Sequence, residues 1–175
     1  MDDLDAINLA LLLLRVVVGV VMFAHGYNHL LRIREGPGVA NWFESLGMKY
    51  APLQAWNVTV FEIVGGVMLV LGIITPLAAA SAAAICIVAW VTEHRKHGFF
   101  IFKPGQGWEY VMVLAVVSIA IGALGAGEWS LDEAFGILDD LSGTTGLLIA
   151  AIAGIGGAAL QLALFWRPPR EGDPS

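Results

Sequence analysis

Charged residues are scarce in this chain of 175 residues, since Asp, Glu, Lys and Arg together make up only 14% of it. Soluble domains carry about one quarter charged residues, whereas 58% of the residues here are hydrophobic. Such an excess of apolar side chains must face lipid. A spanning helix takes about 20 residues, so five spans with short loops fill nearly the whole chain. The composition predicts an integral membrane protein without a separate soluble domain, and it excludes a soluble enzyme.

Cysteine and clustered basic residues are also scarce. The one cysteine, Cys86, lies in an apolar run, which excludes an internal disulfide or a two-cysteine redox motif and favours a small packing residue. The amino terminus reads Met1-Asp2-Asp3-Leu4-Asp5, acidic where a secretory signal is basic, so the first apolar run is expected to be retained. With a net charge of -6 and no dense basic patch, nucleic acid is not an expected partner.

Five apolar runs follow one another along the chain, at residues 7–31, 53–74, 77–91, 108–124 and 146–165. None shows the alternating pattern of a barrel strand, so helix is the expected state of each run. The predicted fold class is therefore an all-α integral membrane protein. Residues 125–145 mix acidic and apolar side chains, which is typical of a short amphipathic helix on the membrane surface.

Lysine and arginine are unevenly divided between the loops. With five spans, the loops after the first and third runs share one side of the membrane with the carboxyl tail. The basic residues of that side are Arg32, Arg34, Lys49, Arg95, Lys96, Lys103, Arg167 and Arg170. The opposite side carries no Lys or Arg, so the positive-inside rule predicts a multi-pass cell (plasma) membrane protein with a cytoplasmic carboxyl terminus and an external amino terminus.

The last run carries small residues at every fourth position, namely Gly146, Ala150, Gly154 and Ala158. Such a stripe allows the backbones of two helices to approach closely. Packing within the chain is the simplest interpretation. A second copy of the chain, giving a homo-oligomer, or a partner subunit are the other candidates for this surface.

Two ionisable residues lie deep within apolar runs, where a charge costs on the order of 3 kcal/mol. Arg15 lies about eight residues into the first run and Glu62 about nine residues into the second, so each is about 12 to 14 Å from its own end. We expect the two side chains to meet. They form either a structural ion pair or a proton-exchanging carboxylate, Glu62, whose protonation Arg15 controls.

All four histidines are expected at helix ends on the cytoplasmic side, together with an amide and two carboxylates. These residues are His25, Asn28, His29, Glu93, His94, His97 and Glu109. Such a group suits proton relay near neutral pH, binding of a divalent metal, or hydrogen bonding to a quinone head group. The aromatic residues that would hold the quinone are Trp42, Phe43, Trp90, Phe99 and Phe100. A di-iron site is disfavoured, because it needs Glu-x-x-His and the Glu93 to His97 spacing is one residue longer.

Several short motifs resemble the DoxX family of small bacterial and archaeal membrane proteins, in order and in spacing, across roughly residues 9 to 136. The motifs are Arg15-Val-Val-Val-Gly19, His25-Gly26, Trp42-Phe43, Leu46-Gly47, Phe61-Glu62-Ile63-Val64-Gly65-Gly66, Leu71-Gly72, Thr75-Pro76, His97-Gly98-Phe99-Phe100, Glu109-Tyr110 and Ser130-Leu131-Asp132. Family members normally carry Arg or Lys after the second helix, and Thr75-Pro76 lacks that charge. The resemblance implies a four-helix membrane core over residues 1–136, to which residues 137–175 add a fifth helix and a cytoplasmic tail.

The resemblance implies a redox role, because some relatives look like subunits of a thiosulfate:quinone oxidoreductase and others belong to membrane redox complexes that handle oxidative and thiol stress. We therefore expect a quinone-interacting subunit without a redox centre of its own. The candidate proton-exchanging residues are His25, Glu62, His97 and Glu109, and the candidate quinone-binding residues are His25, Asn28, His29, Trp42, His97, Phe99 and Glu109. The alternatives are a non-catalytic accessory subunit of a larger respiratory or transport complex and a small transporter along the line from Arg15 to Glu62.

Overall fold

The computed structural model describes residues 2–168, and helices account for most of them. The α-helices are α1 Asp3–Glu35, α2 Gly38–Ser45, α3 Ala51–Leu71, α4 Thr75–Thr92, α5 Glu109–Leu124, α6 Leu131–Ala134, α7 Gly143–Ala151 and α8 Gly157–Phe165. Short 3-10 helices form at His94–His97 and Asp139–Leu141. A π-helical turn, Ile152–Gly156, joins α7 to α8 into one continuous span.

Within residues 2–168, four helical spans are long and apolar enough to cross a bilayer, namely α1, α3, α4 and the continuous run Gly143–Phe165. The fifth predicted run is α5, whose 16 residues extend about 24 Å, a little less than the ~30 Å hydrocarbon core. The predicted all-α membrane class is confirmed. The first helix is longer than predicted, because Asp2 caps its amino end by accepting a 2.8 Å hydrogen bond from the Asp5 backbone N–H.

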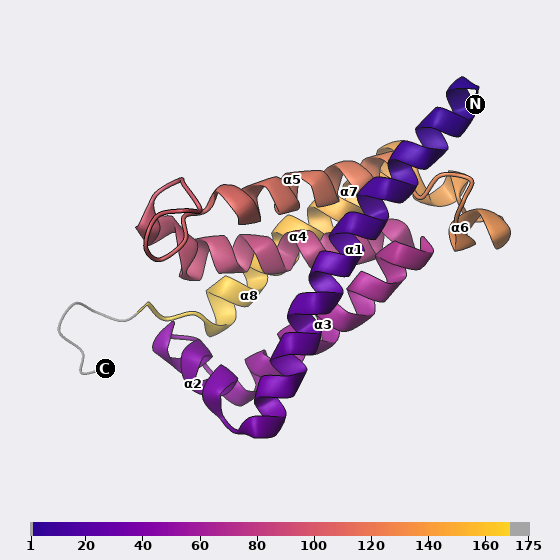
Figure 1. Cartoon of the computed structure of the whole chain (residues 1–175). Helices are drawn as coiled ribbons and strands as arrows, with labels where there is room; N and C mark the ends of the chain where they lie inside the picture. The colour runs from indigo at the N-terminus through magenta and orange to yellow at the C-terminus, as the bar shows by residue number, and fades with distance from the viewer. Residues whose placement is uncertain (1, 169–175) are drawn as a thin grey trace.

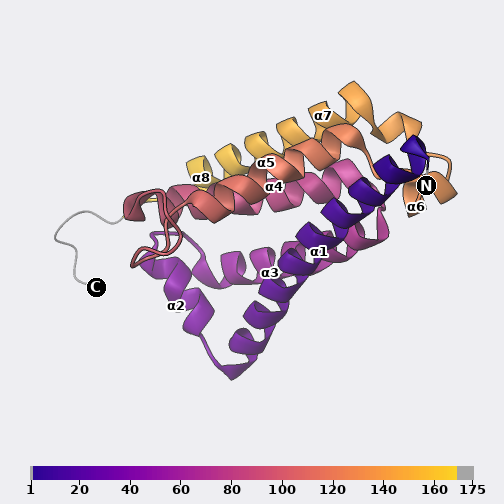
Figure 2. The same ribbon diagram turned by 45° about the horizontal axis from the view of Figure 1, so that its top comes forward.

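The spans form two groups that lie closest at the end holding the amino terminus (Figures 1 and 2). One group is α1 packed along α3, and the other is α4 with α5 and the last span. Figure 2 shows the two groups diverging toward the opposite end, where α2 lies. The short helix α2, which the sequence did not predict, packs there through its buried Val39 and Phe43.

The loops gather at two ends with opposite charge. The basic end contains residues 36–50, residues 93–108 and the carboxyl end of α8. The Lys49 N–H donates to the Phe165 carbonyl over 2.8 Å, Trp166 Nε1 donates to the Leu46 carbonyl over 2.9 Å, and the Arg95 guanidinium lies 5.2 Å from the Trp166 ring centroid. The acidic end contains the start of α1, the α3–α4 turn and residues 125–142. Arg170 and the other tail residues from 169 to 175 lie outside the described residues.

Residues 125–145 differ from the single amphipathic helix that the sequence predicts. They form α6, a 3-10 turn and the first three residues of α7. Helix α6 ends because Gly136 adopts a left-handed conformation (φ 68°), with its N–H bonded to the Glu133 carbonyl and the Ile137 N–H bonded to the Asp132 carbonyl. Asp132 is fully buried rather than solvated. This segment is therefore part of the packed fold and not only a surface cover.

The small-residue stripe of the last span packs within the chain. Ala150 and Ala158 are fully buried, a Cβ on Gly146 would meet the Gly122 carbonyl of α5, and Gly154 lies against Ala80 of α4. The opposite face of this span exposes large apolar side chains such as Ile152 and Leu160. A second copy or a partner subunit would have to contact that opposite face.

Helices α1 and α3 cross closely at Gly19 and Gly66. A Cβ built on Gly66 would lie 2.6 Å from the Gly19 carbonyl oxygen and 2.7 Å from the Phe23 backbone nitrogen, so the two backbones are in direct contact. Neither atom belongs to a flexible side chain, so neither can give way cheaply. The crossing therefore fixes the register of the two helices.

We predict that Gly66→Ala lowers the free energy of unfolding by about 1–3 kcal/mol, because the added methyl group forces the helices apart. The control is Gly156→Ala, since a Cβ on this exposed glycine would meet nothing within 4 Å. Unfolding of the purified protein in mild detergent, followed by tryptophan fluorescence, measures both variants. Equal stability of the two variants would contradict the close crossing.

Candidate functional site

Arg15 is fully buried where the acidic end meets the helical spans. Its Nη1 donates to the carbonyl oxygens of Leu69 (3.2 Å) and Val70 (3.4 Å), and its Nη2 donates to that of Trp129 (2.8 Å). Leu69 and Val70 lie in the last turn of α3, where free carbonyls give a helix a partial negative charge. The guanidinium is thus stabilised by a helix terminus. Gly72 ends α3 with φ 65°, and a Cβ there would collide with Arg15.

The predicted pair of Arg15 and Glu62 does not form, so this prediction is wrong. Arg15 binds carbonyls beginning at Leu69, which lies seven residues beyond Glu62 and hence about 10 Å farther along α3. Equal distances from their own helix ends would place the two residues side by side only if those two helix ends lay at the same depth. The Gly19–Gly66 crossing sets a different register, in which Gly26 of α1 is the residue that lies against Glu62.

Two further buried polar residues, Asn8 and Asp132, hold the acidic end together. The Asp132 carboxylate accepts hydrogen bonds from the backbone N–H groups of Ile74 (2.6 Å) and Thr75 (3.0 Å), which caps the start of α4. Asn8 Nδ2 donates to Glu128 Oε2 over 2.8 Å, and the Glu128 N–H donates to Asn8 Oδ1 over 2.9 Å. Sequence reasoning missed both roles, although an isolated Asn within an apolar run was a usable signal.

Glu62 contacts His29 toward the basic end. Glu62 is 4% exposed, and its Oε2 lies 2.9 Å from His29 Nδ1. The angles do not suit a hydrogen bond, so neither of these two atoms has a hydrogen-bond partner within the described part of the chain. A buried carboxylate and an imidazole in this arrangement can exchange a proton after a small rotation of either side chain.

A cavity of about 250 Å³ lies beside this pair. It is lined by Asn28, His29, Arg32, Gly38, Val39 and Trp42. Helix α1 supplies the polar lining residues, and α2 supplies the aromatic ring of Trp42. His25 is exposed one turn earlier on α1 and does not line the cavity.

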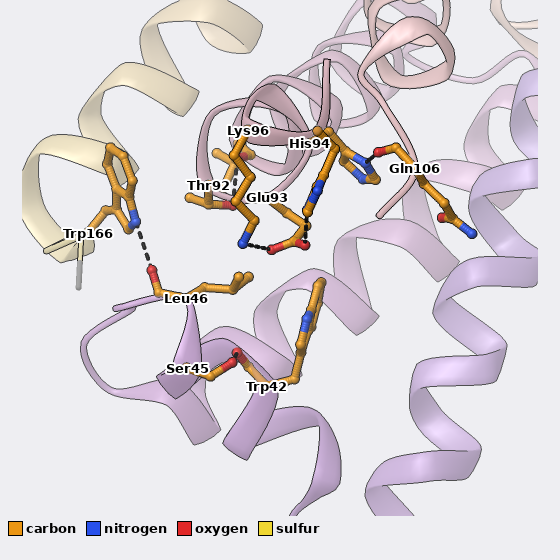
Figure 3. A network of polar contacts seen from close by, with 11 residues as sticks. Trp42, Ser45, Leu46, Thr92, Glu93, His94, Lys96, Gln106 and Trp166 are labelled. Atoms are coloured by element: carbon orange, nitrogen blue, oxygen red, sulfur yellow. Dashed lines mark hydrogen bonds and ion pairs between the residues drawn. The ribbon is translucent and has the colours of Figure 1, made fainter. Parts of the chain in front are cut away.

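A second polar group lies at the same end around Glu93, at the end of α4 (Figure 3). Its carboxylate accepts a hydrogen bond from Lys96 Nζ over 2.8 Å and lies 3.1 Å from His97 Nε2. Burial acts to raise the pKa of Glu93, but the hydrogen bonds from Lys96 and His97 outweigh it and hold this pKa below its ordinary value. His94 Nδ1 lies 2.7 Å from the Gln106 carbonyl oxygen. These contacts fold the loop after α4 back on itself.

The predicted aromatic and acidic residues after α4 serve the same loop. Phe99 packs edge-on against Trp108, which stacks on Trp90 with ring centroids 4.9 Å apart. The Glu109 carboxylate accepts a 3.2 Å hydrogen bond from the Ile101 N–H. The predicted single cluster is therefore two groups, the His29–Glu62 cavity and the loop group around Glu93, His97 and Glu109. Figure 3 shows the Trp42 ring directed from α2 toward Glu93.

Metal ligation has little support in this arrangement. Among residues 2–168, no three His, Cys, Asp or Glu side chains come together as a metal site requires. His29 with Glu62 and Glu93 with His97 are pairs only.

The fold and these buried polar contacts define a small all-helical membrane protein with a polar pair next to one of its ends. Residues 10–95, which run from α1 to just beyond α4, match the DoxX family model. The chain is a DoxX-family membrane protein. A protein of Bacillus subtilis (strain 168) named "Putative oxidoreductase CatD" is similar to it, with 27% identity over 110 residues, which are 63% of this chain and 76% of that protein. No solved structure matches the chain.

A double-mutant cycle between Arg15→Met and Glu62→Gln tests the observed register. We expect Arg15→Met to lower the free energy of unfolding by about 3–5 kcal/mol, because it removes three charge-assisted hydrogen bonds from the buried guanidinium to backbone carbonyls. The coupling energy between the two substitutions is expected to stay within about 0.5 kcal/mol, as for residues without a shared partner. Chemical unfolding in detergent measures all four proteins. A coupling energy of about 1 kcal/mol or more would contradict the observed register and support a direct contact between Arg15 and Glu62.

Proposed function

We propose that this protein is a quinone-interacting subunit of a membrane redox complex, similar in kind to a thiosulfate:quinone oxidoreductase. The observation that carries the proposal is the cavity beside His29, behind which the Glu62 carboxylate is buried. A similar protein whose name contains "oxidoreductase" supports a redox role for the family member described here. The protein would depend on a partner subunit for electrons, since its own side chains offer no redox centre.

The cavity residues fit a quinone head group in size and chemistry. Its volume of about 250 Å³ is near the lower limit of small-molecule pockets, which suits a single substituted ring. A quinone supplies two carbonyl oxygens that accept hydrogen bonds and take up protons on reduction. The Asn28 amide and the His29 imidazole can donate to such oxygens, and Trp42 offers an aromatic face.

The His29–Glu62 pair would hold the proton for this site. Glu62 is too buried to exchange protons directly with water, whereas His29 is half-buried and lines the cavity. A proton on His29 can pass to Glu62 Oε2, 2.9 Å away, without leaving the protein. His97 and Glu109 were also expected to exchange protons. Instead, His97 contacts Glu93 and Glu109 accepts from the Ile101 N–H, and neither residue lines the His29 cavity.

The two alternatives differ in support. A transporter along a polar line from Arg15 to Glu62 loses its basis, because the two side chains bind different partners about 10 Å apart along α3. An accessory or scaffold subunit keeps a basis in the exposed apolar face of the last span, which includes Ile152 and Leu160. Such a subunit would bind its partner without needing the His29 cavity.

We predict that the purified protein binds ubiquinone-1 or menadione, and that His29→Ala and Glu62→Gln each weaken this binding at least tenfold. Isothermal titration calorimetry in detergent measures the affinity. The matched control is His94→Ala, because His94 lies at the same end but contacts the Gln106 carbonyl instead of the cavity. Absence of binding to the unmodified protein, or equal weakening by the control, would overturn the proposal.

We also propose that the basic end faces the cytoplasm of the cell and the acidic end faces outward. The support is the charge division: residues at the basic end include Lys49, Arg95 and Arg167, whereas Arg15 is the one cation that contacts the acidic end within residues 2–168. The positive-inside rule favours this orientation in the cell membrane.

Cysteine labelling of intact cells tests the orientation. Cys86 is buried, so it contributes little background. With a membrane-impermeant maleimide, Asp139→Cys is expected to label in intact cells, and Lys49→Cys only after the membrane is permeabilised. Both positions are exposed in the fold. The reverse labelling pattern would invert the topology.

A further inference from the structure

A second, larger cavity of about 360 Å³ lies between α3, α4 and the last span, on a different side of α3 from the His29 cavity. Small residues, including Gly65, Ala80, Ala84 and Gly157, make up much of its lining. Apolar side chains such as Phe61 and Leu77 form its rim and are about half exposed, as lipid-facing residues are. The cavity therefore opens sideways into the hydrocarbon core and not toward water.

The π-helical turn of the last span borders this cavity. Ala153 lies within the turn and Gly157 follows directly after it, and both line the hollow. Turns of this kind are rare in helices and occur frequently at functional sites. A Cβ on Gly157 would meet nothing within 4 Å, so the space beside this residue is open.

One end of the cavity is polar. Gln161 lines it and donates a 3.0 Å hydrogen bond from Nε2 to Oε1 of Gln54, whose own amide donates to the Lys49 carbonyl over 3.4 Å. These contacts bring Gln161 close to the basic end. Ser81, the other polar lining residue, donates to the Ala78 carbonyl of its own helix.

Three cations gather where the last span reaches the basic end. The Lys49 N–H donates to the Phe165 carbonyl, the Arg167 N–H donates to the Gly47 carbonyl, and the Arg95 guanidinium lies 5.2 Å from the ring centroid of Trp166. Within residues 2–168, no carboxylate comes within ion-pair distance of any of these three side chains. The acidic end, at the other side of the bilayer, carries carboxylates that would repel an anion.

We propose that this cavity binds one acyl chain of an anionic phospholipid, with the head group at the basic end near Gln161, Lys49 and Arg167. The open apolar hollow suits a flexible hydrocarbon chain, and the cations that lack a carboxylate partner suit a phosphate-bearing head group. Bound lipid would fill the gap between α3–α4 and the last span. The site is separate from the His29 cavity, because Glu62 faces α1 whereas Phe61 and Gly65 face this hollow.

A matched pair of glycine variants tests the chain site. Gly157→Leu places an isobutyl group in the cavity, whereas Gly156→Leu adds the same group where there is equally open space but no cavity. After reconstitution into phosphatidylglycerol nanodiscs, native mass spectrometry counts the lipid retained per chain. We expect at least a fivefold loss of retained lipid for Gly157→Leu and no loss for Gly156→Leu. Equal retention by the two variants would overturn the proposal.

The head-group assignment has its own test. The unmodified protein is expected to retain phosphatidylglycerol at least fivefold over phosphatidylcholine from mixed nanodiscs, and the double variant Lys49→Gln, Arg167→Gln should lose this preference while still retaining lipid. No preference in the unmodified protein would overturn the anionic assignment. Retention of an endogenous quinone that Gly157→Leu removes would assign the cavity to that molecule instead. The quinone affinity of the His29 cavity should not change in Gly157→Leu, which keeps the two proposals distinguishable.

Discussion

The buried guanidinium of Arg15 is the constraint on which the rest of the fold depends. A cation this far from water is tolerated only if its donors find acceptors, and here the acceptors are backbone carbonyls of Leu69, Val70 and Trp129. These carbonyls belong to the end of α3 and to the segment after α5. One side chain on α1 therefore fixes where α3 stops and where the segment containing Asp132 returns to cap α4.

The two ends of the protein differ in how their buried carboxylates are held. At the acidic end, Asp132 and Asn8 make short hydrogen bonds to backbone and side-chain partners, which makes this end a rigid closure. Toward the basic end, His29 and Glu62 lie close together without a well-aligned hydrogen bond and border a cavity. Buried polar groups without a partner are rare, and the proposed proton transfer between His29 and Glu62 would account for this arrangement.

The sequence predicts the helical spans well because hydropathy depends only on local composition. It could not predict the register of α1 on α3, because that depends on backbone contact between Gly19 and Gly66, which are far apart in the chain. The misplaced Arg15–Glu62 pair follows directly from this. Likewise, the acidic composition of residues 125–145 suggested a solvated surface helix, whereas Asp132 is buried because two backbone N–H groups at the start of α4 need an acceptor.

Helix α3 has different environments on two of its sides. Neighbouring residues on a helix point about 100° apart, so Glu62 lies against α1 while Phe61, the preceding residue, lines the lipid-facing cavity. Because Arg15 holds the carboxyl end of α3 and Gly66 fixes its crossing with α1, the helix cannot slide or rotate to bring Glu62 toward lipid. Glu62 thus stays beside His29 for as long as Arg15 holds the carboxyl end of α3, and the proton transfer proposed for this pair would depend on packing at the opposite end of the protein.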